Sequence, residues 1–430
     1  MEAIDKKKRN LINFTIFVAA FGYFVDIFDL SLFGIVRVQS LEELGYKNQE
    51  RINEFLNSLG FLGEFFKGLK FNDFMSIGAL LLNLQMLGML VGGIFWGILG
   101  DKVGRKFILF ASILMFSIGN LLNAFVNDAF WYGVLRFVVG VGLAGELGAA
   151  VTLISEVVDK EKRGFANALM ASFGLLGAVV ASIISHFLHW RDMYIIGGLL
   201  GLFLLFFISK TVESEIFSKQ EKDVSRGNFL ILFSNLERFV RYLKVFLLGL
   251  PIWFVFSILI TFSPEVGQAV GIEGGIVAAN SIMLAYFGVS LGDMFAGILT
   301  QKLRSRKKAI LFFYVLSIIT VLLYFFVNFN VYTFYFYNFV LGFASGYWIL
   351  FLLVGAESFG TNIRSTVVNT LPNFVRGSVF IITSTFIYLK GIVGFVFSSI
   401  LLTFVFFGLS IVSLMFIKET FARDLNFVEK

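Results

Sequence analysis

The chain has 430 residues, of which 58% are hydrophobic and only 15% are charged, and its net charge is +6. A soluble protein of this size could not bury so much apolar surface, so the composition predicts a membrane protein. The sequence contains no cysteine, which excludes disulfides and thiolate metal sites, and we expect neither a metal nor a cofactor. The basic residues lie in short loops between apolar runs, a pattern that indicates membrane topology and no binding of nucleic acid.

Twelve apolar segments follow one another along the chain. Each approaches the roughly 20 residues with which an α-helix crosses about 30 Å of hydrocarbon. Helices are required because open strands would leave backbone groups unpaired in lipid. The predicted spans are residues 11–36, 74–99, 107–127, 131–156, 164–186, 193–210, 244–264, 275–300, 309–328, 331–356, 365–389 and 391–417. The predicted fold class is therefore an all-α membrane protein with twelve transmembrane helices.

The lysines and arginines predict the orientation of these spans. Twelve spans place both termini on one side, and 26 of the 35 basic residues lie on that side. By the positive-inside rule we expect a multi-pass protein with both termini in the cytoplasm. We also expect it to be a monomer in a bacterial inner membrane. Residues 38–73 form a predicted outer loop, and residues 210–243 a cytoplasmic connector with an amphipathic part. The predicted domains are accordingly 1–209, the connector 210–243, and 244–430, which ends in a short cytoplasmic tail.

Two patterns recur at an offset close to half of the chain. The loop GILGDKVGRK (97–106) has an echo in GILTQKLRSR (297–306), and the spacing from Glu156 to Arg163 recurs from Glu357 to Arg364. Repetition at such an offset indicates two halves built on one plan.

The first of these loops resembles the signature loop of the major facilitator superfamily. Arg136 with the small residues that follow it is similar to the fourth-helix pattern of that superfamily. The two Glu-to-Arg pairs resemble the charge networks of its sugar-porter branch, and GYFVDIFDLSLFG (22–34) is similar to its metabolite:proton symporter branch. The resemblance implies two pseudo-symmetric six-helix bundles that rock about a central site. It also implies that charged residues at the cytoplasmic ends of the helices form ion pairs that break and re-form during gating. The alternative is that these ion pairs are static contacts within loops. The residues concerned are Asp101, Arg105, Lys106, Glu156, Arg163, Glu357 and Arg364.

Placing a charged side chain inside the membrane costs free energy, so each such residue is a candidate for a functional or structural role. Asp29 and Arg136 are expected at similar depth, and the resemblance places the proton-linked aspartate and arginine of sugar porters at these positions. A structural ion pair is the alternative. Asp26 lies one helical turn from Asp29 and could carry the proton instead. Glu146 lies in a glycine-rich stretch, where a functional and a structural role are equally open.

Arg376 is the most informative of these charges. A guanidinium cannot become neutral, so it requires either an acidic partner, for which Asp293 is the candidate, or an anionic ligand. Polar and aromatic side chains of the second, eighth and tenth spans would complete a substrate site. With Arg376, the candidates for substrate binding are Gln85, Tyr286, Asn338, Tyr347 and Trp348.

These features predict a secondary active transporter that moves a small polar metabolite, an organic anion or zwitterion, by alternating access in symport with protons. No phosphate-cradling loop is present, so we do not expect ATP to drive it. A sugar or polyol transporter with a structural Arg376 is the alternative within transporters. A transporter-like metabolite receptor is an alternative of another class, although the short connector leaves no room for a signalling domain. We expect no enzyme, because no nucleophile–base or metal cluster is present.

Overall fold

The computed structural model describes residues 2–103, 105–148, 150, 163–209, 232–273, 275–327 and 330–421. The described residues form helices and no strand. The helices are α1 (Glu2–Glu43), α2 (Gln49–Ser58), α3 (Phe61–Gly68), α4 (Phe74–Val103), α5 (Arg105–Asn123), α6 (Ala129–Leu143), α8 (Arg163–Ile184), α9 (Trp190–Ser209), α11 (Leu236–Phe254), the π-helix η2 (Val255–Ile260), α12 (Ser263–Ala269), α13 (Ala278–Leu303), α14 (Arg306–Phe326), α15 (Val331–Ala344), α16 (Trp348–Ser358), α17 (Thr361–Gly377), α18 (Val379–Val393) and α19 (Phe395–Phe416).

Within the described residues, 10 helices are long and apolar enough to cross a membrane. Two shorter apolar helices, Phe107–Asn123 and Leu169–Ile184, lie where the third and fifth spans were predicted. The all-helical class is therefore confirmed, whereas the number of twelve spans stays a prediction. Residues 236–243, which the prediction gave to the connector, are the first turns of α11.

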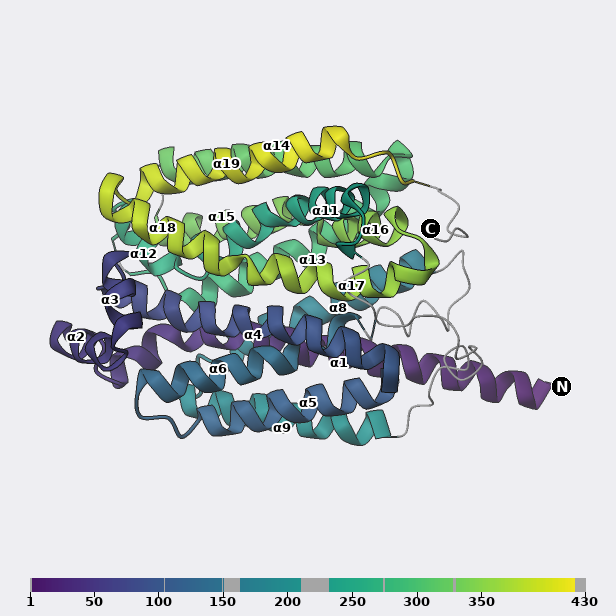
Figure 1. The fold of residues 1–430 in the computed structure, drawn as a ribbon, viewed down its shortest axis with the longest axis horizontal. Coiled ribbons are helices and arrows are strands. Elements are labelled where there is room, and N and C mark those ends of the chain that lie inside the picture. Colours follow the sequence, from purple (N-terminus) through teal and green to yellow (C-terminus); the bar gives the residue numbers. More distant parts are fainter. Residues whose placement is uncertain are drawn as a thin grey trace.

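The long helices run side by side (Figure 1). The helices α2 and α3 cap one end, which we call the α2–α3 end. At the opposite end α1 begins and α19 finishes, and we call this the terminal end. Helix α1 packs against α8 and α9, and α4 packs against α6, while α13 packs against α15 and α11 against α19. Helices from the two parts of the sequence also meet, because α4 contacts α17 and α18, and α13 contacts α1 and α8.

Several spans are interrupted near mid-length. Pro251 lies inside α11, which continues as the π-helix η2, and proline removes one backbone donor from a helix. The tenth span breaks between α15 and α16, and the eleventh breaks at Ser378 between α17 and α18. The break before α16 frees backbone N–H groups at the start of that helix, and such groups can hold charged groups in a membrane protein.

Candidate functional site

A small aromatic cavity lies at these breaks. About 380 Å³ of space between atoms, part of it open to the surroundings, lies here among residues of α1, α8, α11, η2, α13, α16 and α17. We call it the central cavity. Its aromatic and charged lining consists of Tyr23, Trp253, Phe256, Tyr286, Trp348 and Arg376. A second cavity of about 420 Å³ shares Leu30, Trp253, Phe256 and Tyr286 with it and adds polar side chains such as Ser31 and Thr261.

Arg376 is the charged group of the central cavity. Its side chain is 1% exposed, and its Nε and Nη1 atoms have no hydrogen-bond partner among the described residues. Its guanidinium lies 5.7 Å from the ring centroid of Trp253 and 5.9 Å from that of Trp348. The indole Nε1 of Trp253 also lacks a partner within the described chain. Three buried donors thus line one cavity without acceptors, an arrangement that favours an anionic, acceptor-only ligand.

Asp293 does not pair with Arg376 in this structure. Its Oδ1 accepts a hydrogen bond of 3.2 Å from the backbone N–H of Ile349, in the first turn of α16. A carboxylate at a helix N-terminus is stabilised by the free N–H groups and by the helix dipole. Asp293 therefore acts as a cap for α16, and no ion pair between it and Arg376 is found among the described residues.

Arg136 lies in an aromatic and amide environment on α6. It donates a hydrogen bond of 2.5 Å to Oε1 of Gln85, and its guanidinium lies 5.5 Å from the rings of both Phe33 and Tyr194. Arg136 is the cation that acts on Asp29, but the described residues show no direct ion pair between them. Gln85 consequently supports Arg136 and does not line either cavity.

Asp26 and Glu146 are buried beside Asp29. The carboxylate of Asp26 is fully buried, has no hydrogen-bond partner among the described residues, and is acted on by the charge of Arg376. Glu146 is 1% exposed and packs its Oε1 against Gly22 of α1, where a Cβ atom would clash with it. The three acids predicted as proton-coupling candidates therefore gather around one stretch of α1.

Of the other residues predicted to bind substrate, some line the central cavity and some do not. Tyr286 and Trp348 line the central cavity. Asn338 lies elsewhere, where it accepts a hydrogen bond of 2.9 Å from the hydroxyl of Tyr324. Tyr347 packs edge-on against Tyr314, with ring centroids 4.9 Å apart. Neither Asn338 nor Tyr347 is among the lining residues of the two cavities.

The sequence analysis missed Tyr23 and Trp253, which also line the central cavity. Tyr23 lies one helical turn before Asp26. Trp253 lies next to the helix-breaking Pro251, and this proximity was the available signal.

Two ion pairs join the two parts of the sequence at the α2–α3 end. Arg37 of α1 binds Glu265 of α12 through both terminal nitrogens, each 2.8 Å from a carboxylate oxygen. The Nζ atom of Lys390 in α18 lies 2.6 Å from Asp73, which precedes α4. Burial acts to raise the pKa of Asp73, but the hydrogen bond and charge of Lys390 hold this pKa below its usual value. Neither pair was predicted, and both link the two parts of the sequence at this end of the molecule.

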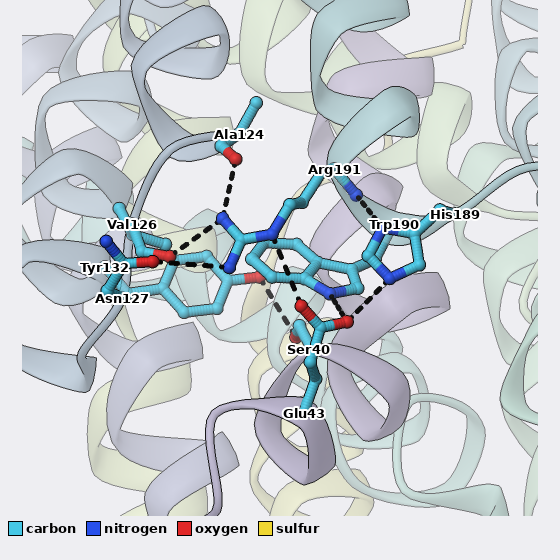
Figure 2. A network of polar contacts seen from close by, with 9 residues as sticks. All are labelled: Ser40, Glu43, Ala124, Val126, Asn127, Tyr132, His189, Trp190 and Arg191. Atoms are coloured by element: carbon cyan, nitrogen blue, oxygen red, sulfur yellow. Dashed lines mark hydrogen bonds and ion pairs between the residues drawn. The ribbon is translucent and has the colours of Figure 1, made fainter.

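The same end of the first part of the chain carries a polar network around Glu43, the last residue of α1 (Figure 2). The Glu43 carboxylate accepts a hydrogen bond of 2.8 Å from Nε1 of Trp190 and lies 2.6 Å from His189. Arg191 donates to the carbonyl oxygens of Ala124 and Val126. The network ties α1, the loop after α5 and the start of α9 into one unit.

The predicted gating charges at the terminal end are only partly described. Glu357 forms an ion pair of 2.9 Å with Arg306, the final arginine of the echo loop. Arg364 donates instead to the carbonyl oxygens of Ala356 and Phe359, although the charge of Glu357 also acts on it. Glu156 lies outside the described residues. The same holds for the side chains of Asp101, Arg105, Lys106 and Arg163.

Comparisons with known proteins identify the family. The sequence model described as Major Facilitator Superfamily matches residues 19–395. The chain is 36% identical over 138 residues to the niacin transporter NiaP of Acinetobacter baylyi, covering 31% of this chain and 31% of that protein. It is 27% identical over 224 residues to the sialic acid transporter NanX of Escherichia coli, covering 50% and 54%. It is 29% identical over 153 residues to the gentisate transporter of Corynebacterium glutamicum, covering 34% of each chain. The matched segments span less than two thirds of each relative.

Proposed function

The chain belongs to the major facilitator superfamily, and from that premise we propose that it is a secondary active transporter for a small organic anion. The observation that carries the proposal is Arg376, a buried arginine with unpartnered donors in an aromatic cavity between helices of both parts of the chain. A buried guanidinium keeps its charge and binds a carboxylate through two parallel hydrogen bonds. A carboxylate ligand would therefore accept hydrogen bonds from the Nε and Nη1 atoms of Arg376, which have no partner among the described residues.

Three of the relatives support the same class of substrate, whereas two relatives from Drosophila melanogaster are named for organic cations. Niacin, sialic acid and gentisate, named for three relatives, each carry a carboxyl group. The central cavity offers Trp253, Trp348 and Tyr286 as apolar faces with few polar groups, which suits a compact acid or zwitterion. A sugar or polyol would require several hydrogen-bonding side chains around each hydroxyl.

Alternating access is the mechanism that this arrangement supports. We infer twelve spans in two six-helix bundles, residues 1–209 and 244–430, joined by a cytoplasmic connector, with both termini in the cytoplasm. The Arg37–Glu265 and Asp73–Lys390 pairs then close the outer end. Rocking of the bundles would break these pairs and form others at the terminal end, and coupling to protons would drive accumulation.

Uptake into proteoliposomes tests this proposal. We expect uptake of labelled nicotinate, gentisate or sialic acid, and none of a neutral polyol. The variant Arg376→Gln loses two charge-assisted hydrogen bonds of about 1.5–3 kcal/mol each, so binding should weaken by at least about 150-fold. Arg376→Lys should recover part of it. The control is Arg304→Gln, which removes an exposed arginine outside the cavity and should bind like the unaltered protein.

Two outcomes would contradict the proposal. Unchanged anion affinity in Arg376→Gln would remove its basis. Transport of a sugar or polyol without transport of any acid would favour the alternative, in which Arg376 is structural. The transport signal should also collapse when the proton gradient is dissipated, if symport is correct.

A further inference from the structure

Five charged side chains are buried together at the centre of the molecule. They are Asp26, Asp29, Glu146, Arg136 and Arg376, and each is at most 1% exposed. Three carboxylates and two guanidinium groups would carry one net negative charge if every acid were ionised. Asp293 is also fully buried and acts on Tyr23, but its carboxylate caps α16, so its charge is counted apart from these five. Because an unbalanced buried charge is strongly unfavourable, this cluster should hold one proton before any substrate binds.

The geometry of α1 separates its two aspartates. Tyr23, Ile27 and Leu30 point into the central cavity. At about 100° per residue, Asp26 lies about 60° from the mean direction of these three and Asp29 about 120° from it. The Oδ1 atom of Asp29 packs against Gly197 of α9, where a Cβ atom would clash. Asp26 is therefore beside the cavity, and Asp29 faces away from it.

Each aspartate has a different arginine. The cation that acts on Asp29 is Arg136, which comes from the same part of the chain. The cation that acts on Asp26 is Arg376, which comes from the other part and lines the cavity. A carboxylate that binds Arg376 would therefore compete with Asp26, and not with Asp29, for positive charge.

Glu146 differs from both aspartates. The charges that act on it are those of Asp26 and Asp29, and no arginine is among them in the described part of the chain. Because the described charges that act on it are of like sign, we infer that Glu146 holds the resting proton. With this proton in place the cluster of five is neutral.

We propose that Asp26 is the carboxylate that couples substrate binding to proton uptake. This inference rests on the proposed function. When a substrate carboxylate binds Arg376, it neutralises the guanidinium in place of Asp26. Asp26 then accepts one proton from water, which restores the neutrality of the cluster. The proton returns to water when the substrate leaves on the other side of the membrane. One monocarboxylate thus moves with one proton, and the cycle carries no net charge.

The groups that face Asp26 are consistent with this role. Asp29 and Tyr23 lie on its own helix, Glu146 follows α6, and Tyr286 lies on α13. Asp293, also on α13, acts on Tyr23 and is held by the N-terminus of α16. All are acids or phenols, and none can replace Arg376 as a counter-charge. The helices α8 and α9, which also pack against α1, contribute no described charged group that acts on Asp26. The assignment differs from the sugar-porter resemblance, which gives the proton to Asp29.

Proton uptake during binding tests the assignment without requiring transport. Purified protein in weak buffer is titrated with nicotinate, or with whichever of the three acids the uptake screen selects, while a pH dye reports protons. We expect one proton per bound acid, and a dissociation constant that rises up to about tenfold per pH unit. Asp26→Asn should bind the acid with no proton uptake and no pH dependence. Asp29→Asn should still take up the proton.

Asp192→Asn serves as a control, because Asp192 is an exposed acid at the start of α9 and should behave like the unaltered protein. In proteoliposomes, Asp26→Asn should exchange acid for acid but should not accumulate it in response to a proton gradient. Proton uptake that persists in Asp26→Asn, or that disappears in Asp29→Asn alone, would overturn the inference. If the unaltered protein binds none of the acids, the proposed function itself fails, and this outcome is distinct.

Discussion

Removing the Arg37–Glu265 ion pair should open the α2–α3 end. The Arg37 side chain is fully buried, the Glu265 side chain is 16% exposed, and two contacts of 2.8 Å join them. Arg37 also lies 4.3 Å from the ring centroid of Phe262. Breaking a buried ion pair costs about 3–5 kcal/mol. Because Glu265 can regain water in Arg37→Ala, we expect the lower value, about 3 kcal/mol, which shifts the equilibrium toward the open state by about 150-fold.

The absence of native cysteine makes this shift measurable. Ser257 is 2% exposed and lines the second cavity, so Ser257→Cys should react with a membrane-impermeant maleimide only when this end opens. The labelling rate should rise by about two orders of magnitude when Arg37→Ala is added. Glu265→Gln, which preserves shape and removes charge, should have an effect in the same direction. The double variant Arg37→Glu with Glu265→Arg should return part of the way to the slow rate.

A cysteine at the exposed position Glu54 of α2 provides the reference, because its labelling should not change in any of these variants. Equal labelling of Ser257→Cys with and without Arg37→Ala would refute the reasoning. The ion pair would then be a local contact that does not control access to the cavity.

Two further predictions concern pH and packing. The pKa of Asp73 is lowered below its ordinary value of 3.8, since Lys390 and Ser76 outweigh the effect of burial. A lowered pKa in the closed state means that the contribution of this pair is complete above the usual value and is lost as the pH falls through the lowered one. Distances between spin labels at Glu54→Cys and Glu273→Cys should therefore stay constant from about pH 8 to 5 and increase only in stronger acid; an increase between pH 7 and 5 would contradict this. Gly342 of α15 packs against the backbone of Ala285 in α13, whereas Gly408 has no neighbour within 4 Å. Gly342→Ala should lower stability by about 1–3 kcal/mol, while Gly408→Ala should leave the thermal midpoint in the same detergent within a degree.

The apolar runs determined where most spans lie, because the length needed to cross a bilayer leaves little freedom. The ends of helices were less predictable. Helix α1 continues to Glu43 and thereby carries Arg37 into the buried contact with Glu265, although the predicted first span ends at residue 36. Both partners look like surface charges in the sequence, and their contact joins segments 228 residues apart. Patterns of neighbouring residues in the sequence cannot predict a contact between segments that are so far apart in the chain.

The costs of burying charge identified Arg376, Asp26, Asp29 and Glu146 as important, but not their partners. The partner of Asp293 is a helix N-terminus that exists because the tenth span breaks before Trp348. The repeat also paired Glu357 with Arg364 by spacing, whereas the ion pair of Glu357 is with Arg306. In both cases the tertiary structure supplies a group that is distant in sequence. Periodicity could indicate the face of a helix, but not what packs against it.

The sequence repeat does not extend to the buried arginines. Glu156 and Glu357 are 201 residues apart, but the same offset places Tyr337 opposite Arg136 and Leu175 opposite Arg376. Each part of the chain thus contributes one arginine to the buried cluster around Asp26, at positions that the repeat does not relate. Leu175 lines the same cavity as Arg376, so a single guanidinium is available there for a ligand. Since Asp26 lies on the other part of the chain and shares that guanidinium, a ligand bound to Arg376 alters the electrostatic contact between the two parts. Substrate binding can therefore affect their relative movement without any further contact.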